Sequence, residues 1–118
     1  MTVQSAYLSP VFGAGQQAFD NQGRVLAGGK LYSYSAGTTT PLATWTDSTA
    51  TVANNNPMVF SAAGRPYAEV WLNAGAPHKL VLKDSNNVTI ATWDNISGIN
   101  DVSSDDMSYL PAGSGAVA

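Results

Sequence analysis

The stretch from Gly28 to Asp94 constrains the fold most, because short runs of β-branched, aromatic and aliphatic residues alternate there with clusters of turn-forming residues. Runs of about four to eight such residues, bounded by Gly, Pro, Asn or Asp, are typical of β-strands. We find no convincing helical period, apart from one turn near residues 104–107. The sequence therefore predicts an all-β domain in which the strands follow one another as an antiparallel meander.

The alternation of apolar and polar residues gives the predicted strands and their faces. The predicted strands are residues 30–34, 42–45, 58–60, 67–72, 78–83 and 88–93. In the first of them, Tyr32 and Tyr34 share one face and are expected to point away from Leu31. In the fifth, Leu80 and Leu82 are expected to point inward, with the lysines on either side pointing outward.

Turn-forming residues separate the strands. Residues 73–75 and 84–87 each predict the turn of a hairpin, because Asn and Gly accept a positive φ. Residues 47–56 are polar and contain few apolar anchors, so they predict a loop that runs along the surface.

Composition and charge exclude several classes of function. Five basic and eight acidic residues give a net charge of −3, which argues against nucleic acid as a partner, since phosphate contacts need clustered Lys or Arg. Cysteine is absent, so neither a disulfide nor thiol chemistry is available. The N-terminus lacks the pattern of a signal peptide. No run approaches the ~18 apolar residues of a membrane span, so we expect no membrane partner.

Residues that can carry chemistry are few and scattered. His78 is the only histidine, and no second His or Cys is present to complete a metal site, so we expect a solvated side chain. Asp105 and Asp106 are interpreted as part of a polar linker, with weak calcium binding as the alternative. The remaining acids fall in separate turns. We therefore expect no catalytic residue, cofactor or metal site.

The aromatic residues permit two interpretations. They are Tyr32, Tyr34, Trp45, Tyr67, Trp71 and Trp93. The first interpretation is that they fill the core and pair across strands. The second is that some of them line a subunit interface or a sugar-stacking platform. A carbohydrate-binding module would need Trp45, Trp71 or Trp93 to be exposed and coplanar.

The two ends differ in character from the centre. Residues 1–24 are a polar lead and predict an N-terminal arm, in which residues 10–12 form a short apolar patch. Residues 25–98 form the predicted β domain. Residues 99–118 consist largely of Gly, Ser, Asp and Ala, and predict an extended linker toward a downstream domain.

A succession of short motifs carries a resemblance to a known family. In order, the motifs are Gly28-Gly29-Lys30-Leu31-Tyr32 and residues 36–41, 45–47, 56–57, 63–65, 81–84 and 93–95. Together they resemble the N-terminal particle-binding domain of tailspikes and tail fibres from short-tailed bacteriophages. Residues 109–118 resemble the connector that precedes the β-helical domain in many tailspikes.

The resemblance implies a homotrimer of small β-sandwich-like units, with two antiparallel sheets per subunit. It implies a virion structural domain, made in the host cytoplasm, that anchors a tailspike or tail fibre to portal-adaptor or nozzle proteins of the tail or neck. Any polysaccharide-degrading activity would belong to a downstream domain and not to this chain. The alternatives are a carbohydrate-binding module and a complete small adaptor joining a fibre to the tail. The interface candidates are Tyr7, Val11, Phe12, Tyr32, Tyr34 and Trp71.

Overall fold

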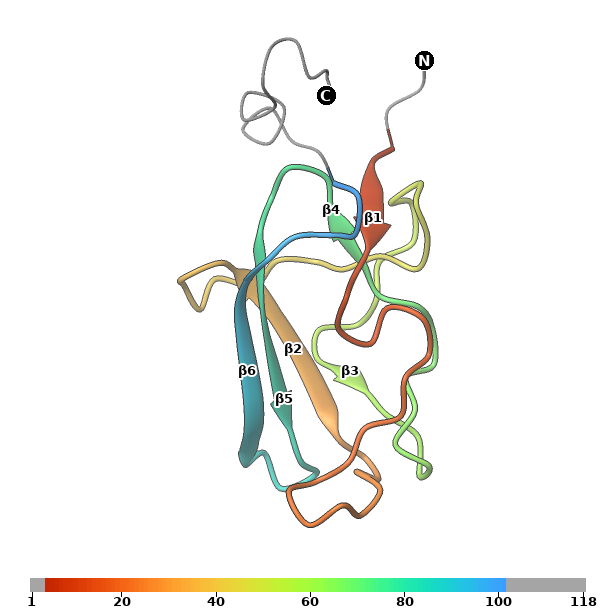
Figure 1. Ribbon diagram of the computed structural model, residues 1–118, viewed down its shortest axis with the longest axis vertical. Helices are drawn as coiled ribbons and strands as arrows, with labels where there is room; N and C mark the ends of the chain where they lie inside the picture. Colours follow the sequence, from red (N-terminus) through yellow and green to blue (C-terminus); the bar gives the residue numbers. More distant parts are fainter. Residues whose placement is uncertain (1–3, 102–118) are drawn as a thin grey trace, which may run out of the picture.

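The computed structural model describes residues 4–101, and this part of the chain is all-β, in two antiparallel sheets (Figure 1). The smaller sheet pairs β1 (Ala6–Leu8) with β4 (Trp71–Asn73). The larger sheet has the order β3-β2-β5-β6. Its strands are β2 (Lys30–Ser35), β3 (Met58–Val59), β5 (His78–Lys83) and β6 (Thr89–Ile96). The predicted fold class, an antiparallel β-sandwich-like domain with two sheets, is confirmed.

The strand order differs from the predicted meander. β5 pairs with β2 and not with β4, so the turn at residues 73–75 does not close a hairpin. The turn itself forms, with Gly75 at a φ of 71°, but β4 leads away to pair with β1. The other predicted hairpin is present: β5 and β6 pair across residues 84–87, where Asn87 has a φ of 67°.

One predicted strand, residues 42–45, is absent from the structure, and another, residues 67–72, is shorter. Residues 42–45 form isolated bridges only, and Trp45 exchanges both backbone hydrogen bonds with Trp71, at 2.8 and 2.9 Å. Residues 67–70 stay outside the ladder, because the partner strand β1 is only three residues long. Val70 instead bonds through its backbone to loop residues Ser9 and Gly13. Trp45 therefore adds a single bridge beside β4, whereas Val70 connects the start of β4 to the N-terminal loop.

One hydrophobic core lies beneath the larger sheet and reaches the smaller one. The predicted alternation is confirmed: Leu31 and Leu80 face the core, while Tyr32 and Tyr34 are half-buried on the opposite face. The core cluster comprises Phe12, Ala18, Leu26, Leu31, Met58, Phe60, Val70, Leu72, Leu80 and Leu82. Because β2 and β5 supply inward side chains from the middle of the sheet, their other face is free to carry function.

The N-terminal segment packs as part of this body, and not as a separate arm. Residues 6–8 form a ladder with β4, and Phe12 and Ala18 are buried in the core. At the other end, Ile99 N–H donates to the Leu8 carbonyl at 2.7 Å, so the predicted linker begins attached to β1. The prediction for residues 102–118 lies outside the described residues.

The loop of residues 47–56 is not a simple surface excursion. Asn54 is buried, and its amide donates to Thr44 Oγ1 and to the carbonyls of Trp45 and Glu69 at 3.0–3.2 Å. The Asn56 side chain accepts from Ser33 N–H at 2.9 Å and donates to the Ser33 carbonyl at 2.7 Å. It thereby covers the edge of β2 as a neighbouring strand would.

Candidate binding surfaces

His78 is a structural residue, and the prediction of a solvated side chain is wrong. The ring is fully buried, with Nδ1 at 2.9 Å from the Ala76 carbonyl and Nε2 at 3.1 Å from the Ala43 carbonyl. Burial lowers the pKa of His78, while the two carbonyls oppose that shift because they favour the protonated ring. The imidazole therefore lies between β5 and residues 42–45, and each of its nitrogens faces a backbone carbonyl oxygen.

The described carboxylates are likewise engaged in local structure. Asp20 accepts from the backbone N–H groups of Arg24 and Gln22, and these bonds lower its pKa, the Arg24 bond most. Asp47 accepts from the side chain and backbone of Thr49, which lowers its pKa in the same way. The carboxylates that accept such hydrogen bonds are Asp20, Asp47, Glu69, Asp84, Asp94 and Asp101.

The described His, Asp and Glu side chains are spread over separate turns and strands. Within residues 4–101 no cluster of three His, Cys, Asp or Glu side chains could hold a metal ion, and Asp105 and Asp106 lie outside that range. The same part of the chain contains no helix long and apolar enough to cross a membrane. The described residues form two candidate binding surfaces, a pocket and a sheet face.

The first such surface is a pocket of about 240 Å³ between β1, β4 and residues 99–100, which we term the Tyr7–Trp71 pocket. Its lining residues are Gln4, Tyr7, Leu8, Trp71, Ile99 and Asn100. Gly98 allows this arrangement, because a Cβ there would lie 2.4 Å from Tyr7 Cβ and 2.8 Å from the Tyr7 carbonyl oxygen. The pocket thus joins two interface candidates that lie far apart in the sequence, and it suits an apolar side chain of a partner.

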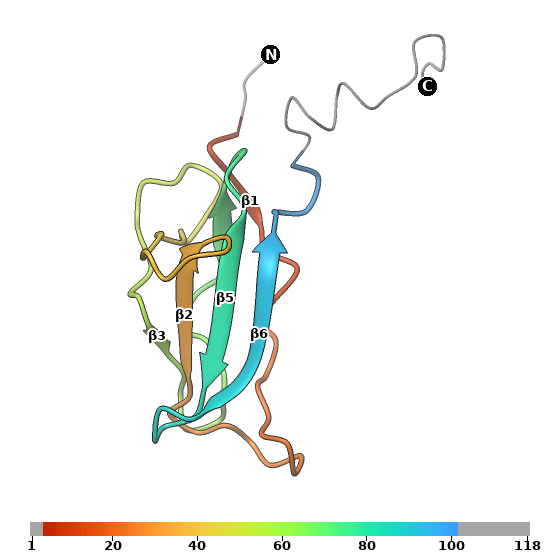
Figure 2. The same cartoon turned by 90° about the vertical axis from the view of Figure 1, so that its left-hand side faces the viewer.

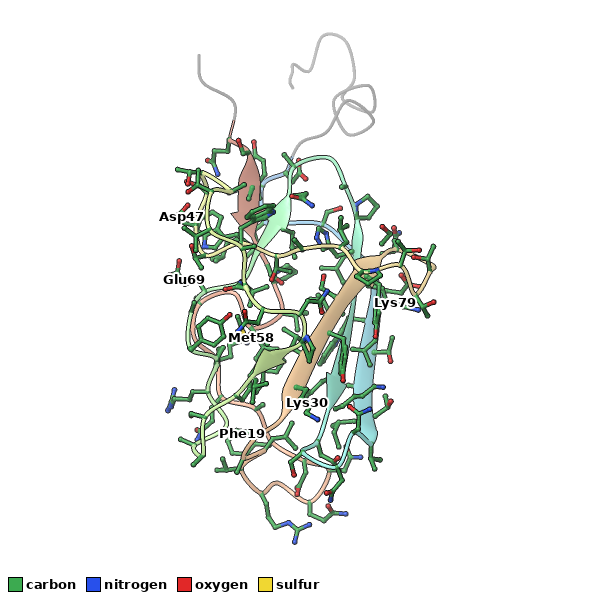
Figure 3. All side chains as sticks on the ribbon, turned by 180° about the vertical axis from the view of Figure 1, so that it is seen from behind. Phe19, Lys30, Asp47, Met58, Glu69 and Lys79 are labelled. Atoms are coloured by element: carbon green, nitrogen blue, oxygen red, sulfur yellow. The ribbon has the colours of Figure 1, made fainter. Side chains whose placement is uncertain are left out.

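The second surface is the outer face of β2 and β5, which we term the lysine–tyrosine face. It consists of Lys30, Tyr32, Tyr34, Lys79, Val81 and Lys83. The register sets Lys30 opposite Lys83 and Tyr34 opposite Lys79. Figure 2 views this sheet face on, and Figure 3 labels Lys30 and Lys79, which lie over the larger sheet away from Asp47 and Glu69.

The side chains of this face hold one another in place. The Tyr32 and Tyr34 rings are parallel, with centroids 6.2 Å apart. Lys79 Nζ lies 5.5 Å from the Tyr34 centroid and Lys83 Nζ lies 4.9 Å from the Tyr32 centroid, which are cation–π distances. Tyr32 also donates its hydroxyl to Asn87 Oδ1 at 2.9 Å. Burial, and then the neighbouring Tyr32, raise the pKa of Tyr34, so its hydroxyl stays protonated at neutral pH.

The structure corrects one interface candidate and qualifies another. Phe12 is buried, with its ring packed edge-on against Phe60 and Trp93 at centroid distances of 5.2 and 6.1 Å, so it is a core residue and not a docking residue. Val11 is partly buried and packs against the same core. The other four candidates divide between the two surfaces, Tyr7 and Trp71 on one and the two β2 tyrosines on the other.

Each of the three tryptophans makes contacts within the fold. Trp45 Nε1 donates to Asn73 Oδ1 at 2.6 Å, and Trp71 Nε1 donates to Glu69 Oε1 at 2.9 Å. Trp93 packs against the core. All three side chains are half-buried, and among residues 4–101 the one parallel aromatic pair is formed by tyrosines.

Sequence reasoning did not single out the lysines as candidate site residues. Alternation along residues 78–83 does place Lys79 and Lys83 outward. Their position beside Tyr34 and Tyr32, however, follows from the pairing of β5 with β2, which the predicted meander did not contain.

Comparison with known proteins assigns no family to this chain. It matches no protein-family model, and a search of curated proteins finds no match. A functional proposal therefore rests on the geometry of the two surfaces and on the succession of motifs in the sequence.

Proposed function

We propose that this chain is a virion structural domain that anchors a tailspike or tail fibre to the tail or neck of a bacteriophage particle. The motif succession between residues 28 and 95 suggests the family. The observation that carries the proposal is that His78 and all six described carboxylates serve hydrogen bonds of the fold itself. A domain whose titratable groups are used in this way supports binding and assembly better than catalysis.

The proposal includes a homotrimer that docks to portal-adaptor or nozzle proteins. Two features favour a partner copy. The first is the Tyr7–Trp71 pocket, because its lining includes Ile99, an apolar side chain that is 48% exposed. The second is β6, which pairs only with β5, so within residues 4–101 its outer edge has no strand partner. Association covers open sheet edges and apolar surface that a small domain leaves exposed.

Light scattering on the purified chain tests the trimer. We expect a mass three times the 12.2 kDa of one chain. Ile99→Asp places a charge on the pocket rim and should shift the mass toward the monomer. Val88→Asp is the matched control, because Val88 is 58% exposed and precedes β6, whereas Ile99 follows the other end of that strand. A monomer at every concentration, or equal effects of the two substitutions, would contradict the proposed assembly.

The carbohydrate-binding alternative finds less support than the anchoring role. A carbohydrate-binding module needs open stacking faces, whereas the three tryptophans hydrogen-bond to neighbours or pack on the core. Saccharide binding by the isolated chain, abolished by Trp71→Ala, would favour that module. A complete small adaptor would use the same surfaces and differs from an anchoring domain only in what the chain is joined to.

A further inference from the structure

The cations of this chain are unevenly distributed, and the lysine–tyrosine face concentrates them. The sequence contains three lysines, Lys30, Lys79 and Lys83, and all of them lie on this one face of one sheet. The chain as a whole carries a net charge of −3, so the face is a local cationic region on an acidic protein. Such a region attracts anionic groups locally, even though the protein as a whole carries a negative charge.

The three ammonium groups have no carboxylate partner in the described structure. Among residues 4–101 the single ion pair is Arg24–Asp20, at 3.0 Å, in a turn. Asp84, which follows Lys83, accepts from two N–H groups of its own turn. Asp94, on the neighbouring strand β6, accepts from the backbone of Gly37 and Asn95.

The arrangement also sets like charges against each other. Lys30 and Lys83 are directly opposite across the β2–β5 ladder, and such like-charge pairs destabilise a sheet. The ammonium groups of Lys79 and Lys83 lie over the rings of Tyr34 and Tyr32, and these cation–π contacts position two cations four residues apart on one strand. In an extended strand this separation is about 13 Å.

We propose that the lysine–tyrosine face binds an extended acidic segment of a protein partner, whose carboxylates pair with Lys30, Lys79 and Lys83. Acidic residues four positions apart in an extended peptide have the spacing of Lys79 and Lys83, since both chains then follow the same rise per residue. A carboxylate between Lys30 and Lys83 relieves their mutual repulsion. Charge complementarity of this kind sets the register and speeds association.

A protein segment fits this face better than a long polyanion. The tyrosine rings already contact each other and the lysine ammonium groups, so they do not offer open faces for stacking bases. A nucleic acid or acidic polysaccharide would extend past the three lysines onto a protein surface with a net negative charge. The inference depends on this face alone and does not require the trimer or the anchoring role proposed above.

Fluorescence anisotropy with labelled decaglutamate tests the proposal on the full 118-residue chain. We expect binding at about 20 mM NaCl that weakens at about 200 mM, because added salt shortens the screening length. Lys79→Gln with Lys83→Gln should weaken binding about tenfold, and Lys79→Arg with Lys83→Arg should retain it. The charge-matched control, Arg24→Gln with Arg65→Gln, removes two cations outside the face and should change affinity less than about twofold.

Circular dichroism of each variant checks that the fold is kept, and the Lys→Arg pair keeps the test valid if the glutamine pair unfolds. No binding of decaglutamate at low salt, or an equal loss in the control pair, would overturn the proposal. Tighter binding of a thymidine decanucleotide or of polygalacturonate would also overturn it. A fall in the light-scattering mass of the Lys→Gln pair would assign the face to a second copy of this chain instead.

Discussion

Replacing Phe12 with alanine should lower the free energy of unfolding by about 3–5 kcal/mol, the usual cost of truncating a buried phenylalanine. Phe12 is 7% exposed, so folding removes almost all of its ring from water. The ring packs edge-on against both Phe60 and Trp93, and each such aromatic contact contributes about 0.5–1.5 kcal/mol of that total. Since domains of this size are stable by only about 5–15 kcal/mol, the substitution removes a large share of the stability.

Urea denaturation at one protein concentration, followed by tryptophan fluorescence, measures this loss, because Trp93 lies against the substituted ring. Thermal melting should show a fall of about 15–30 °C. Phe19→Ala is the matched control from the same N-terminal segment: Phe19 is 47% exposed, and we expect a loss below about 1 kcal/mol. Phe12→Leu keeps most of the volume and provides a folded variant if Phe12→Ala does not fold.

A loss below about 1 kcal/mol for Phe12→Ala would show that the ring contributes little to the core. Equally small losses at Phe12 and Phe19 would show that the whole N-terminal segment contributes little to the core. Either result would return Phe12 to the set of docking candidates and restore the predicted N-terminal arm.

Two further predictions concern polar side chains that hydrogen-bond to distant parts of the backbone. Burial holds the pKa of His78 below its ordinary value of 6.5, so the unfolded chain takes up a proton first as the pH falls. Stability should be complete above about pH 6.5 and decline as the pH falls toward the folded-state value, and His78→Gln should flatten this dependence of the urea midpoint. Asn56→Ala removes both hydrogen bonds to the Ser33 backbone and should cost about 1–3 kcal/mol in urea denaturation. The adjacent Asn55 provides the comparison: Asn55→Ala should cost no more than about 0.5 kcal/mol, and an equal cost would refute the edge-covering role of Asn56.

The sequence predicts the central strands of the larger sheet well, because their pattern is local. The predicted strand 78–83 coincides with β5, where buried Leu80 and Leu82 alternate with outward lysines. The predicted strand 30–34 differs from β2 by one residue. Their turns contain residues at positive φ, such as Gly37 and Asn87, which the sequence also indicates.

The sequence does not predict which segments of the chain pair with one another. β1 is three residues long and carries no alternation to identify it, yet it decides where β4 pairs. Asn54 and Asn56 belong to a segment with the composition of a surface loop, but their side-chain amides hydrogen-bond to backbone groups of distant residues. The lysine–tyrosine face and the Tyr7–Trp71 pocket both depend on such non-local pairings, so sequence patterns supply their residues and not their assembly.

The pairing of β1 has a consequence for the order of folding. Ala6 pairs with Asn73, and the Leu8 carbonyl accepts from Ile99, so the strand that is synthesised first completes its contacts only when nearly the whole described chain exists. The β5–β6 hairpin closes through a local turn and pays little loop entropy. We expect the β5–β6 hairpin to form early and β1 to pair after the rate-limiting step of folding. The contacts of β1 would then lower the rate of unfolding and leave the rate of folding nearly unchanged.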